Sequence, residues 1–454
     1  MFCSSSESTI PIRVLTAEEL EDWLNEAEPA DRHWATAREF DAAEGATLVL
    51  PDGSGSIKGV LCGREPGDLI WSLAHLPREL KSGEYRLEGD WSANEFELLY
   101  LGWALGDYAF DRYKPAARSK ARLALPAEQA ARIRALVEAT TLIRDLVNTP
   151  ASDLGPAELA EAASDLAERF GADYRCIQGD ELAQDFPAIH VVGQASSRAP
   201  RLIRLQWGEE SAPPLALVGK GVIFDSGGLD IKPGAGMVLM KKDMGGAAHV
   251  LGLAQLIMAL GLKVNLRVYI PAVENAISGN AYRPSDIIRT RNGTTVEIGN
   301  TDAEGRVVLS DALTLACEEG AERVIDFATL TGAARIALGE DLPPLFARNT
   351  EQARAIQDRS FELQDPLWHM PLFEGYRRQI QPAIADLSNT GTSKFGGSLT
   401  AALFLDHFVA QEVDWMHLDV YAWNLGNRPG RPAGGEAQGF RAIFEWLERQ
   451  YGSV

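Results

Sequence analysis

Residues 219–246 read GKGVIFDSGGLDIKPGAGMVLMKKDMGG, and this stretch decides the fold prediction. Its apolar beginning predicts a buried strand that delivers Asp225 at the carboxyl end, and Ser226-Gly227-Gly228 predicts a flexible turn. Asp243 lies directly before Gly245-Gly246 and an apolar helix. A strand, a glycine-rich turn and a helix in this order are typical of α/β folds, which bind ligands beyond the carboxyl ends of their strands.

Strand-like and helix-like segments alternate on both sides of this stretch. We expect strands near Leu215 to Phe224, Lys263 to Pro271, Arg323 to Thr329 and Trp415 to Val420. We expect helices near Ala247 to Leu260, Gly305 to Glu319, Thr400 to Gln411 and Glu436 to Arg449. Alternation of this kind predicts an α/β fold with a largely parallel or mixed central sheet flanked by helices.

The chain length of 454 residues allows two or three domains. We expect a smaller N-terminal α/β domain over residues 1–127, because its pattern differs and it carries no cluster of acids, bases or metal ligands. A linker helix is predicted over residues 128–146, and a larger C-terminal α/β domain over residues 147–454. The expected architecture therefore has two domains joined by a helix.

The net charge of −21 limits the possible partners. An acidic surface repels phosphate backbones and anionic lipid headgroups, so nucleic acid and membranes are not expected as partners. The four cysteines lie far apart without a CxxC pair, which indicates a reducing compartment and no thiolate zinc site. The N-terminus has no signal-peptide pattern, and the apolar stretch from Val250 is too short to span a bilayer. We therefore expect a cytoplasmic protein.

A second acidic stretch, residues 300–306, reads NTDAEGR and precedes a predicted helix. Alternate residues of an extended segment point to one side, so Asp302, Glu304 and Arg306 can converge on one volume. Taken singly, these carboxylates can be read as helix caps or turn residues. Together with those of the first stretch they make four carboxylates that need cations, either basic side chains or divalent metals. A metal pair would supply the chemistry of hydrolysis.

The sequence motifs of competing enzyme classes are absent. No HExxH, Gly-x-Ser-x-Gly or Walker A pattern occurs. The segment Pro233 to Gly236 is interpreted as a structural turn, and Asn292-Gly293 as a hairpin turn. His249 and His417 lie outside any motif, so packing or hydrogen bonding is expected of them.

The two stretches and two further blocks resemble the leucyl aminopeptidase family, the cytosol aminopeptidases with two metals. The further blocks are VNTPASDLGPAEL from Val147 and ATLTGA from Ala328. The resemblance covers the last two thirds of the chain and implies an aminopeptidase fold and activity. The N-terminal third resembles the smaller, variable domain of that family.

The resemblance implies a role for each candidate residue. One metal would be held by Asp225, Asp302 and Glu304, and the second by Lys220, Asp225, Asp243 and Glu304. The expected ions are zinc or manganese, with cobalt or magnesium as alternatives. Lys232 and Arg306 would be catalytic, Lys232 on the scissile carbonyl and Arg306 through a bicarbonate ion that acts as general base. Substrate contacts are implied for Met240, Thr329, Leu330 and Gly332.

The implied reaction is attack by a hydroxide on the first peptide carbonyl of a substrate with a free N-terminus. The family also implies a homohexamer, a dimer of trimers. Two departures from the commoner family pattern stand out: Gly245 where relatives often carry Cys or Ser, and residues 420–424, VYAWN, where many carry smaller residues. The second departure makes a leucine preference less secure than aminopeptidase activity.

Two other functions compete with this one. A protein that keeps the fold but acts as a binding or regulatory protein, such as a DNA-binding protein, could lose its metal ligands and should show a basic face. A dinuclear hydrolase of non-peptide amides would share the same metal chemistry. Intact ligands and the acidic net charge favour the aminopeptidase over the DNA-binding protein, and only substrate profiling separates the two hydrolases.

Overall fold

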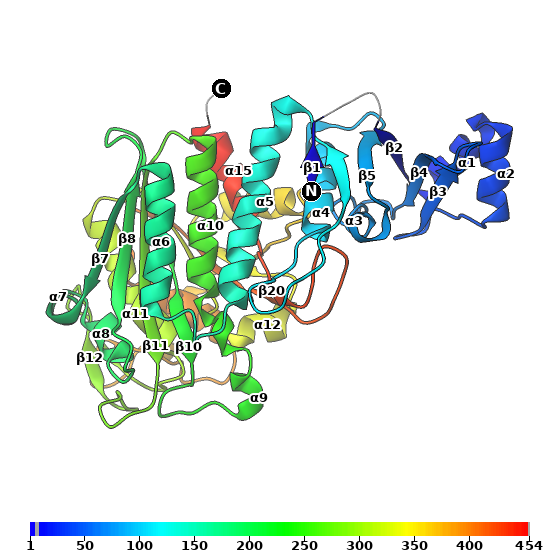
Figure 1. Cartoon of the computed structure of the whole chain (residues 1–454). Helices are drawn as coiled ribbons and strands as arrows, with labels where there is room; N and C mark the ends of the chain where they lie inside the picture. The colour runs from blue at the N-terminus through cyan, green and yellow to red at the C-terminus, as the bar shows by residue number, and fades with distance from the viewer. Residues whose placement is uncertain (5–8, 453–454) are drawn as a thin grey trace. The chain divides into compact units, whose positions relative to one another are not determined.

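The computed structural model of the chain describes residues 1–4 and 9–452. They form two compact units (Figure 1). The smaller unit comprises Met1–Glu138 and Leu425–Ala433, and the larger comprises Ala139–Asn424 and Gly434–Val454. The boundary falls within helix α5 (Ala127–Asn148), where the sequence predicts a linker helix.

The smaller unit is built on a six-stranded sheet with the order β1-β6-β5-β2-β4-β3. Its strands are β1 (Phe2–Cys3), β2 (Ile10–Leu15), β3 (Thr47–Pro51), β4 (Ile57–Gly63), β5 (Gly83–Glu88) and β6 (Ala121–Ala124). All neighbouring strands are parallel except β3, which pairs antiparallel with β4. Its helices are α1 (Ala17–Glu26), α2 (Pro29–Ala37), α3 (Leu76–Glu79) and α4 (Ala93–Gly106). The N-terminal unit is thus α/β, as expected.

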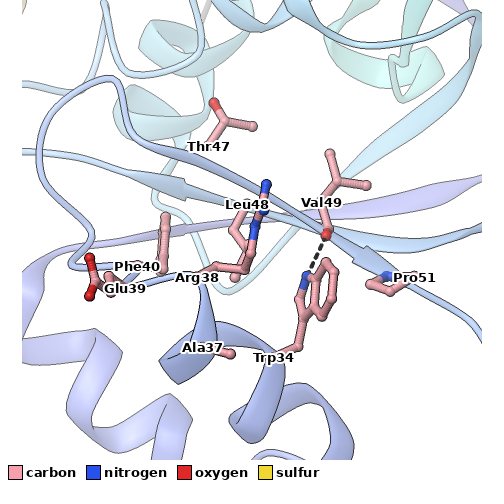
Figure 2. Close-up of a pocket in the computed structure, with 9 residues that line it drawn as sticks. All are labelled: Trp34, Ala37, Arg38, Glu39, Phe40, Thr47, Leu48, Val49 and Pro51. Atoms are coloured by element: carbon pink, nitrogen blue, oxygen red, sulfur yellow. Dashed lines mark hydrogen bonds between the residues drawn. The ribbon is translucent and has the colours of Figure 1, made fainter.

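A cavity of about 580 Å³ lies between α2 and the edge strand β3 of this unit (Figure 2). The Trp34 indole N–H donates to the Val49 carbonyl at 3.1 Å and so occupies part of the open strand edge. Glu39 is the one acidic residue among those that line the cavity. The cavity therefore lacks the carboxylate set that the sequence singles out.

The larger unit contains a nine-stranded mixed sheet with the order β16-β15-β18-β14-β9-β11-β8-β7, and β10 pairs with β11. The strands are β7 (Asp173–Gln178), β8 (Arg201–Trp207), β9 (Pro214–Gly219), β10 (Gly221–Asp225), β11 (Asn265–Asn275), β14 (Arg323–Ala328), β15 (Pro344–Ala347), β16 (Trp368–Met370) and β18 (Asp414–Asp419). The central strands β18, β14, β9 and β11 run parallel, whereas β7, β8 and β15 add antiparallel pairs. The mixed central sheet is therefore confirmed.

Helices cover both faces of this sheet (Figure 1). On one face α10 (Gly245–Leu260) packs against α6 (Pro156–Phe170) and α15 (Phe440–Tyr451), and on the other α11 (Glu304–Glu318) packs against α8 (Pro187–Gly193) and α14 (Gly397–Asp406). The remaining helices are α7 (Gly179–Asp185), the single turn α9 (Gly234–Met237), α12 (Gly332–Leu338), α13 (Thr350–Glu362) and the 3-10 helices η1 (Met240–Met244) and η2 (Glu374–Ile380). The layered arrangement matches the predicted alternation.

Helix α10 is the core helix of this unit. It is buried on all sides from Gly245 to Met258, as expected of a helix that is apolar all round. By length and composition the stretch Gly234–Leu260 could cross a membrane, but 89% of its apolar window is buried inside the unit. Its apolar character is thus explained by packing.

Two short sheets complete the unit. Strands β12 (Ile287–Arg289) and β13 (Thr295–Glu297) form an antiparallel pair that β17 (Leu387–Ser388) extends. Gly293 between β12 and β13 has φ of 88°, which confirms the predicted hairpin turn. The second sheet pairs β19 (Trp423–Asn424) with β20 (Gly434–Gly435).

Four predicted elements differ from the structure. The helix predicted over residues 400–411 spans Gly397–Asp406 as α14. The single strand predicted over residues 215–224 is two strands, β9 and β10, which are separated at Lys220. The Lys220 carbonyl oxygen accepts from the Ala247 N–H of α10 and so does not pair with a neighbouring strand. The predicted helix over residues 436–449 begins only at Phe440, because Glu436 is engaged in a buried ion pair with Arg144. In the segment Pro233 to Gly236, Pro233 precedes the one-turn helix α9 and the other three residues lie within it, so the segment is helical rather than only a turn.

Candidate metal centre

The predicted acidic residues meet at one edge of the central sheet. Asp225 is the last residue of β10, Asp243 lies in η1, and Glu304 is the first residue of α11. Ligand atoms of Asp225, Asp302 and Glu304 all lie within 4.8 Å of one another. The structure therefore brings together two acidic stretches that are far apart in the sequence.

Lys220 is buried within this cluster, with only 3% of its surface exposed. Its Nζ lies 2.7 Å from Asp243 Oδ2, 2.9 Å from Glu304 Oε1 and 3.0 Å from the Thr329 carbonyl oxygen. A Cβ atom at Gly305 would lie 2.5 Å from Lys220 Cε, so a larger residue there would displace the end of the lysine side chain from its place at the start of α11. This contact explains the glycine of the NTDAEGR stretch.

Lys232 approaches the cluster from the other side. Its Nζ lies 2.8 Å from Asp225 Oδ2 and 2.5 Å from Asp302 Oδ1. The Lys232 side chain is 16% exposed, whereas that of Lys220 is 3% exposed. Of the two lysines, Lys232 is therefore the one that a substrate can reach more easily.

The charge balance of the cluster fits divalent cations. Glu304 is 1% exposed, and among residues 1–4 and 9–452 its Oε2 has no hydrogen-bond partner. Burial, with the neighbouring Asp225, raises the pKa of Glu304 well above its usual value. Burial, with the neighbouring Asp243, raises the pKa of Asp225 to about 6. A buried carboxylate with an unpaired oxygen is stabilised by a bound cation, so the residues present suit a metal site.

Lys220 is subject to opposing effects. Its burial favours the neutral amine, but the carboxylates of Asp243, Glu304 and Asp225 outweigh burial and raise the pKa of Lys220 above its usual value. Cations bound to these carboxylates would remove that stabilisation of the ammonium ion. The donor set is therefore compatible with a neutral lysine ligand when the site is loaded.

Arg306 lies in the first turn of α11 and is buried, with 8% of its surface exposed. Its Nη1 donates to the Asn389 carbonyl oxygen at 2.8 Å, while its Nε has no partner in the described chain. Burial lowers the pKa of Arg306 to about 10. The guanidinium thus retains a buried donor that suits an anion.

The loop after β14 contains the predicted substrate contacts Thr329, Leu330 and Gly332. Thr329 Oγ1 lies 2.7 Å from Asp243 Oδ1, which joins this loop to the metal-ligand segment. Asp419 accepts from the Leu330 N–H at 2.8 Å and from the Thr331 N–H at 3.1 Å. The Leu330 N–H is therefore engaged within the protein. Met240 begins η1 and is half-buried.

Three residues that sequence reasoning missed hold these loops in place. Asn275 Nδ2 donates to Asp225 Oδ1 at 2.8 Å, and Asn389 Nδ2 donates to the Asn300 carbonyl oxygen at 2.7 Å. Asp419 holds the loop after β14. Asn275 and Asp419 end strands β11 and β18, so the rule that identified Asp225 could have found them. Asn389 lies in a loop without a pattern that would single it out.

The two motif-free histidines are structural, as predicted. His249 Nδ1 lies 2.6 Å from the Gly245 carbonyl oxygen, and its Nε2 accepts from the Gln438 N–H at 2.9 Å. His417 Nδ1 lies 2.5 Å from Asp326 Oδ1 on the neighbouring strand. Both rings are fully buried.

Comparison with known proteins shows which family has this arrangement. A family model described as the cytosol aminopeptidase family, catalytic domain, matches residues 141–444. A second model, the M17 aminopeptidase N-terminal domain, matches residues 10–126. The chain belongs to the cytosol aminopeptidase family.

Individual members of the cytosol aminopeptidase family align over most of the chain. A probable cytosol aminopeptidase of Clostridium perfringens is 38% identical over 378 residues, which is 79% of this chain and 76% of that protein. The crystal structure of the cytosol aminopeptidase from Coxiella burnetii has a TM-score of 0.96 and 47% identity, covering 99% of this chain and 98% of that one. The bottromycin maturation enzyme BotP in complex with Mn has a TM-score of 0.88 and 32% identity, covering 98% of this chain and 99% of that one. As a member of this family, the chain is an aminopeptidase.

Proposed function

We propose that this aminopeptidase uses two divalent cations to release N-terminal amino acids from peptides. The observation that carries the proposal is the buried cluster of Asp225, Asp302 and Glu304, in which Glu304 Oε2 has no partner among the described residues. We assign one cation to these three carboxylates. The second cation is assigned to Lys220, Asp225, Asp243 and Glu304. When bound, such a pair supplies Lewis acidity and lowers the pKa of water for hydrolysis.

Asp243 is proposed to accept the α-amino group of the substrate. It is buried and contacts Thr329 of the proposed substrate loop. An internal peptide bond carries no free amine there, so this contact would restrict cleavage to the first residue. Met240, Leu330 and Gly332 would hold the rest of that residue.

Lys232 is proposed to stabilise the negative charge that develops on the carbonyl oxygen. Its partial exposure, compared with the buried Lys220, supports this assignment. A preorganised ammonium group in a site of low dielectric constant is effective for this purpose. Arg306 is proposed to bind bicarbonate, since its buried Nε is an available donor and bicarbonate can accept the proton of the attacking water.

Manganese and zinc are the proposed metals, and the Mn-containing relative BotP supports manganese. Cobalt and magnesium are the alternatives to test. The name cytosol aminopeptidase, which relatives carry, supports a cytoplasmic location. A homohexamer is proposed from the family resemblance, and light scattering of the purified protein tests it.

The deciding experiment uses metal-depleted protein and a panel of aminoacyl chromogenic substrates. We expect no turnover without metal and restored turnover after Mn²⁺ or Zn²⁺ is added. N-acetylated versions of the best substrates serve as matched controls and should not be cleaved. Equal rates for free and blocked substrates would contradict the assignment to Asp243 and favour a hydrolase of other amides. Full activity in chelator would contradict the metal proposal.

A further inference from the structure

Tyr421 lies in the segment that departs from the commoner family pattern, and two cations share its ring. Lys242 Nζ lies 4.7 Å from the ring centroid, and Arg335 Cζ lies 4.9 Å from it. Neither cation forms a salt bridge with a carboxylate in residues 1–4 and 9–452. In a chain with a net charge of −21, two such cations at one aromatic ring need an explanation.

The two cations belong to different parts of the proposed substrate site. Lys242 is buried in η1 and directly precedes Asp243. Arg335 is exposed in α12, the helix that begins at Gly332 of the substrate loop. The ring of Tyr421 therefore contacts both η1, whose Asp243 would bind the substrate amine, and α12. Helix α12 follows the loop that would hold the substrate main chain.

Gln438 fixes the backbone on which Tyr421 is carried. Its Oε1 accepts from the N–H groups of Tyr421 at 3.1 Å and Ala422 at 2.8 Å. Its Nε2 donates to the carbonyl oxygen of Glu340, just beyond α12, at 2.6 Å. The backbone N–H of Gln438 donates in turn to His249 of the core helix. The position of the ring is thus set by buried hydrogen bonds from the rigid part of the unit.

The backbone bends directly after Tyr421, at Ala422, and the surrounding hydrogen bonds hold this bend. Ala422 has φ of 57°, in the left-handed region that residues other than glycine seldom adopt. Such a conformation persists only where the surroundings enforce it, and strained residues of this kind gather at functional sites. The hydrogen bonds from Gln438 supply part of that enforcement.

We propose that Tyr421 is a positioning residue that, through its contacts with Lys242 and Arg335, fixes Asp243 relative to the loop Thr329–Gly332. The proposal rests on the proposed function, because it assumes that these two parts bind the amine and the main chain of one substrate. The ring acts by its negative face, which attracts cations, so its hydroxyl group is not required. The carboxylates Asp225, Asp302 and Glu304 lie on other elements and keep their geometry when the ring is removed.

The test compares three variants with the wild-type holoenzyme: Tyr421→Phe, Tyr421→Leu and Arg335→Met. Loss of a cation–π contact should raise KM roughly three- to thirtyfold in Tyr421→Leu, and kcat should fall by a smaller factor than KM rises, because Asp243 is the one proposed metal ligand that the ring positions. Tyr421→Phe keeps the aromatic face and should retain the wild-type KM. Arg335→Met changes an exposed side chain, so it should fold normally and raise KM by about threefold.

Phe361→Leu is the control for loss of an aromatic ring from the catalytic unit; Phe361 is exposed on α13, whereas Tyr421 is half-buried. It should leave KM and kcat unchanged. A wild-type KM in both Tyr421→Leu and Arg335→Met would overturn the proposal, as would a Tyr421→Phe variant as impaired as Tyr421→Leu. Equal loss in Phe361→Leu would also overturn it.

A second measurement does not depend on activity. Denaturant unfolding of wild type, Tyr421→Leu, Arg335→Met and the double variant gives the coupling between the two side chains. We expect the effects to be less than additive, whereas strictly additive effects would overturn the contact. An inactive wild-type protein with coupled variants would instead contradict the proposed function alone.

Discussion

A Cβ atom added to Gly245 would lie 2.5 Å from the Cβ of Ala422 and 3.0 Å from Cγ2 of Thr329. Gly245 begins the core helix α10, and Ala422 is the left-handed residue after Tyr421. The two departures from the commoner family pattern are therefore one structural feature, because the bend of residues 421–424 occupies the space that a side chain at position 245 would need.

The first prediction follows from this contact. Gly245→Ser should lower the free energy of unfolding by about 1–3 kcal/mol, because it overpacks a buried site. Ala422→Gly in the same chain should restore much of the loss, since it removes the methyl group that collides. Thermal and denaturant unfolding of the three proteins measure this, and a Gly245→Ser variant as stable as wild type would contradict the contact.

The second prediction concerns Glu304. Glu304→Ala should reduce turnover of aminoacyl substrates by at least roughly 100-fold, because it removes a proposed bridging ligand. Metal content, measured on the dialysed protein, should fall with it. Glu318→Ala, at the exposed far end of the same helix, is the control and should keep both. Wild-type turnover of Glu304→Ala in metal-supplemented buffer would disprove the two-metal assignment.

The third prediction concerns Asp419, which accepts hydrogen bonds from Leu330 and Thr331. Asp419→Ala should raise KM by about tenfold, because the loop loses bonds to a charged acceptor. Asp419→Asn keeps one carbonyl oxygen for the two backbone donors, so its effect should be smaller. Steady-state kinetics with one good substrate separate the two variants, and equal KM values in all three proteins would exclude the positioning role.

The fourth prediction concerns His249, whose burial lowers its pKa to about 4. The ring is neutral in the folded chain, consistent with its Nε2 accepting from Gln438. Between pH 6.5 and 4 the unfolded chain binds a proton that the folded chain does not, so stability falls as the pH falls through this range. The contribution is about 3 kcal/mol.

Denaturant unfolding of metal-depleted protein at pH 7.5 and pH 4.5 measures this effect. The His249→Gln variant should lose the corresponding part of the pH dependence, because glutamine does not titrate. His33→Gln, an exposed site in the smaller unit, should retain it. An unchanged pH dependence in His249→Gln would show that this ring does not cause it.

Sequence patterns predicted the parts of the site that follow simple rules. Asp225 was identifiable because a buried apolar run delivers it at the carboxyl end of a strand, and Glu304 because it precedes an apolar helix. The strands β7, β8, β15 and β16, at the two sides of the central sheet, were not predicted. β15 and β16 have only four and three residues, and β7 is mostly exposed, so these strands carry a weak pattern.

Interactions between distant segments could not be predicted in the same way. The break between β9 and β10 depends on α10, because the Ala247 N–H of that helix donates to the Lys220 carbonyl oxygen. The residues around Lys220 give no local pattern that would indicate this contact. The role of Asn389 depends on bonds to a loop about 90 residues earlier, and no spacing rule covers such a contact. The choice of Gly245 likewise becomes clear only when Ala422 is seen beside it.

Asn389 and Asp419 hold loops of the site and lie late in the sequence, so the site is completed late during synthesis of the chain. A growing chain leaves the ribosome from its N-terminus. Asp225, Asp243, Asp302 and Glu304 therefore emerge before Asn389, which holds the loop at Asn300, and before Asp419, which holds the loop after β14. The nascent chain thus contains the acidic residues of the site before it contains the residues that hold the loops of the site in place. Synthesis itself delays the onset of proteolytic competence until nearly the whole catalytic unit has been translated.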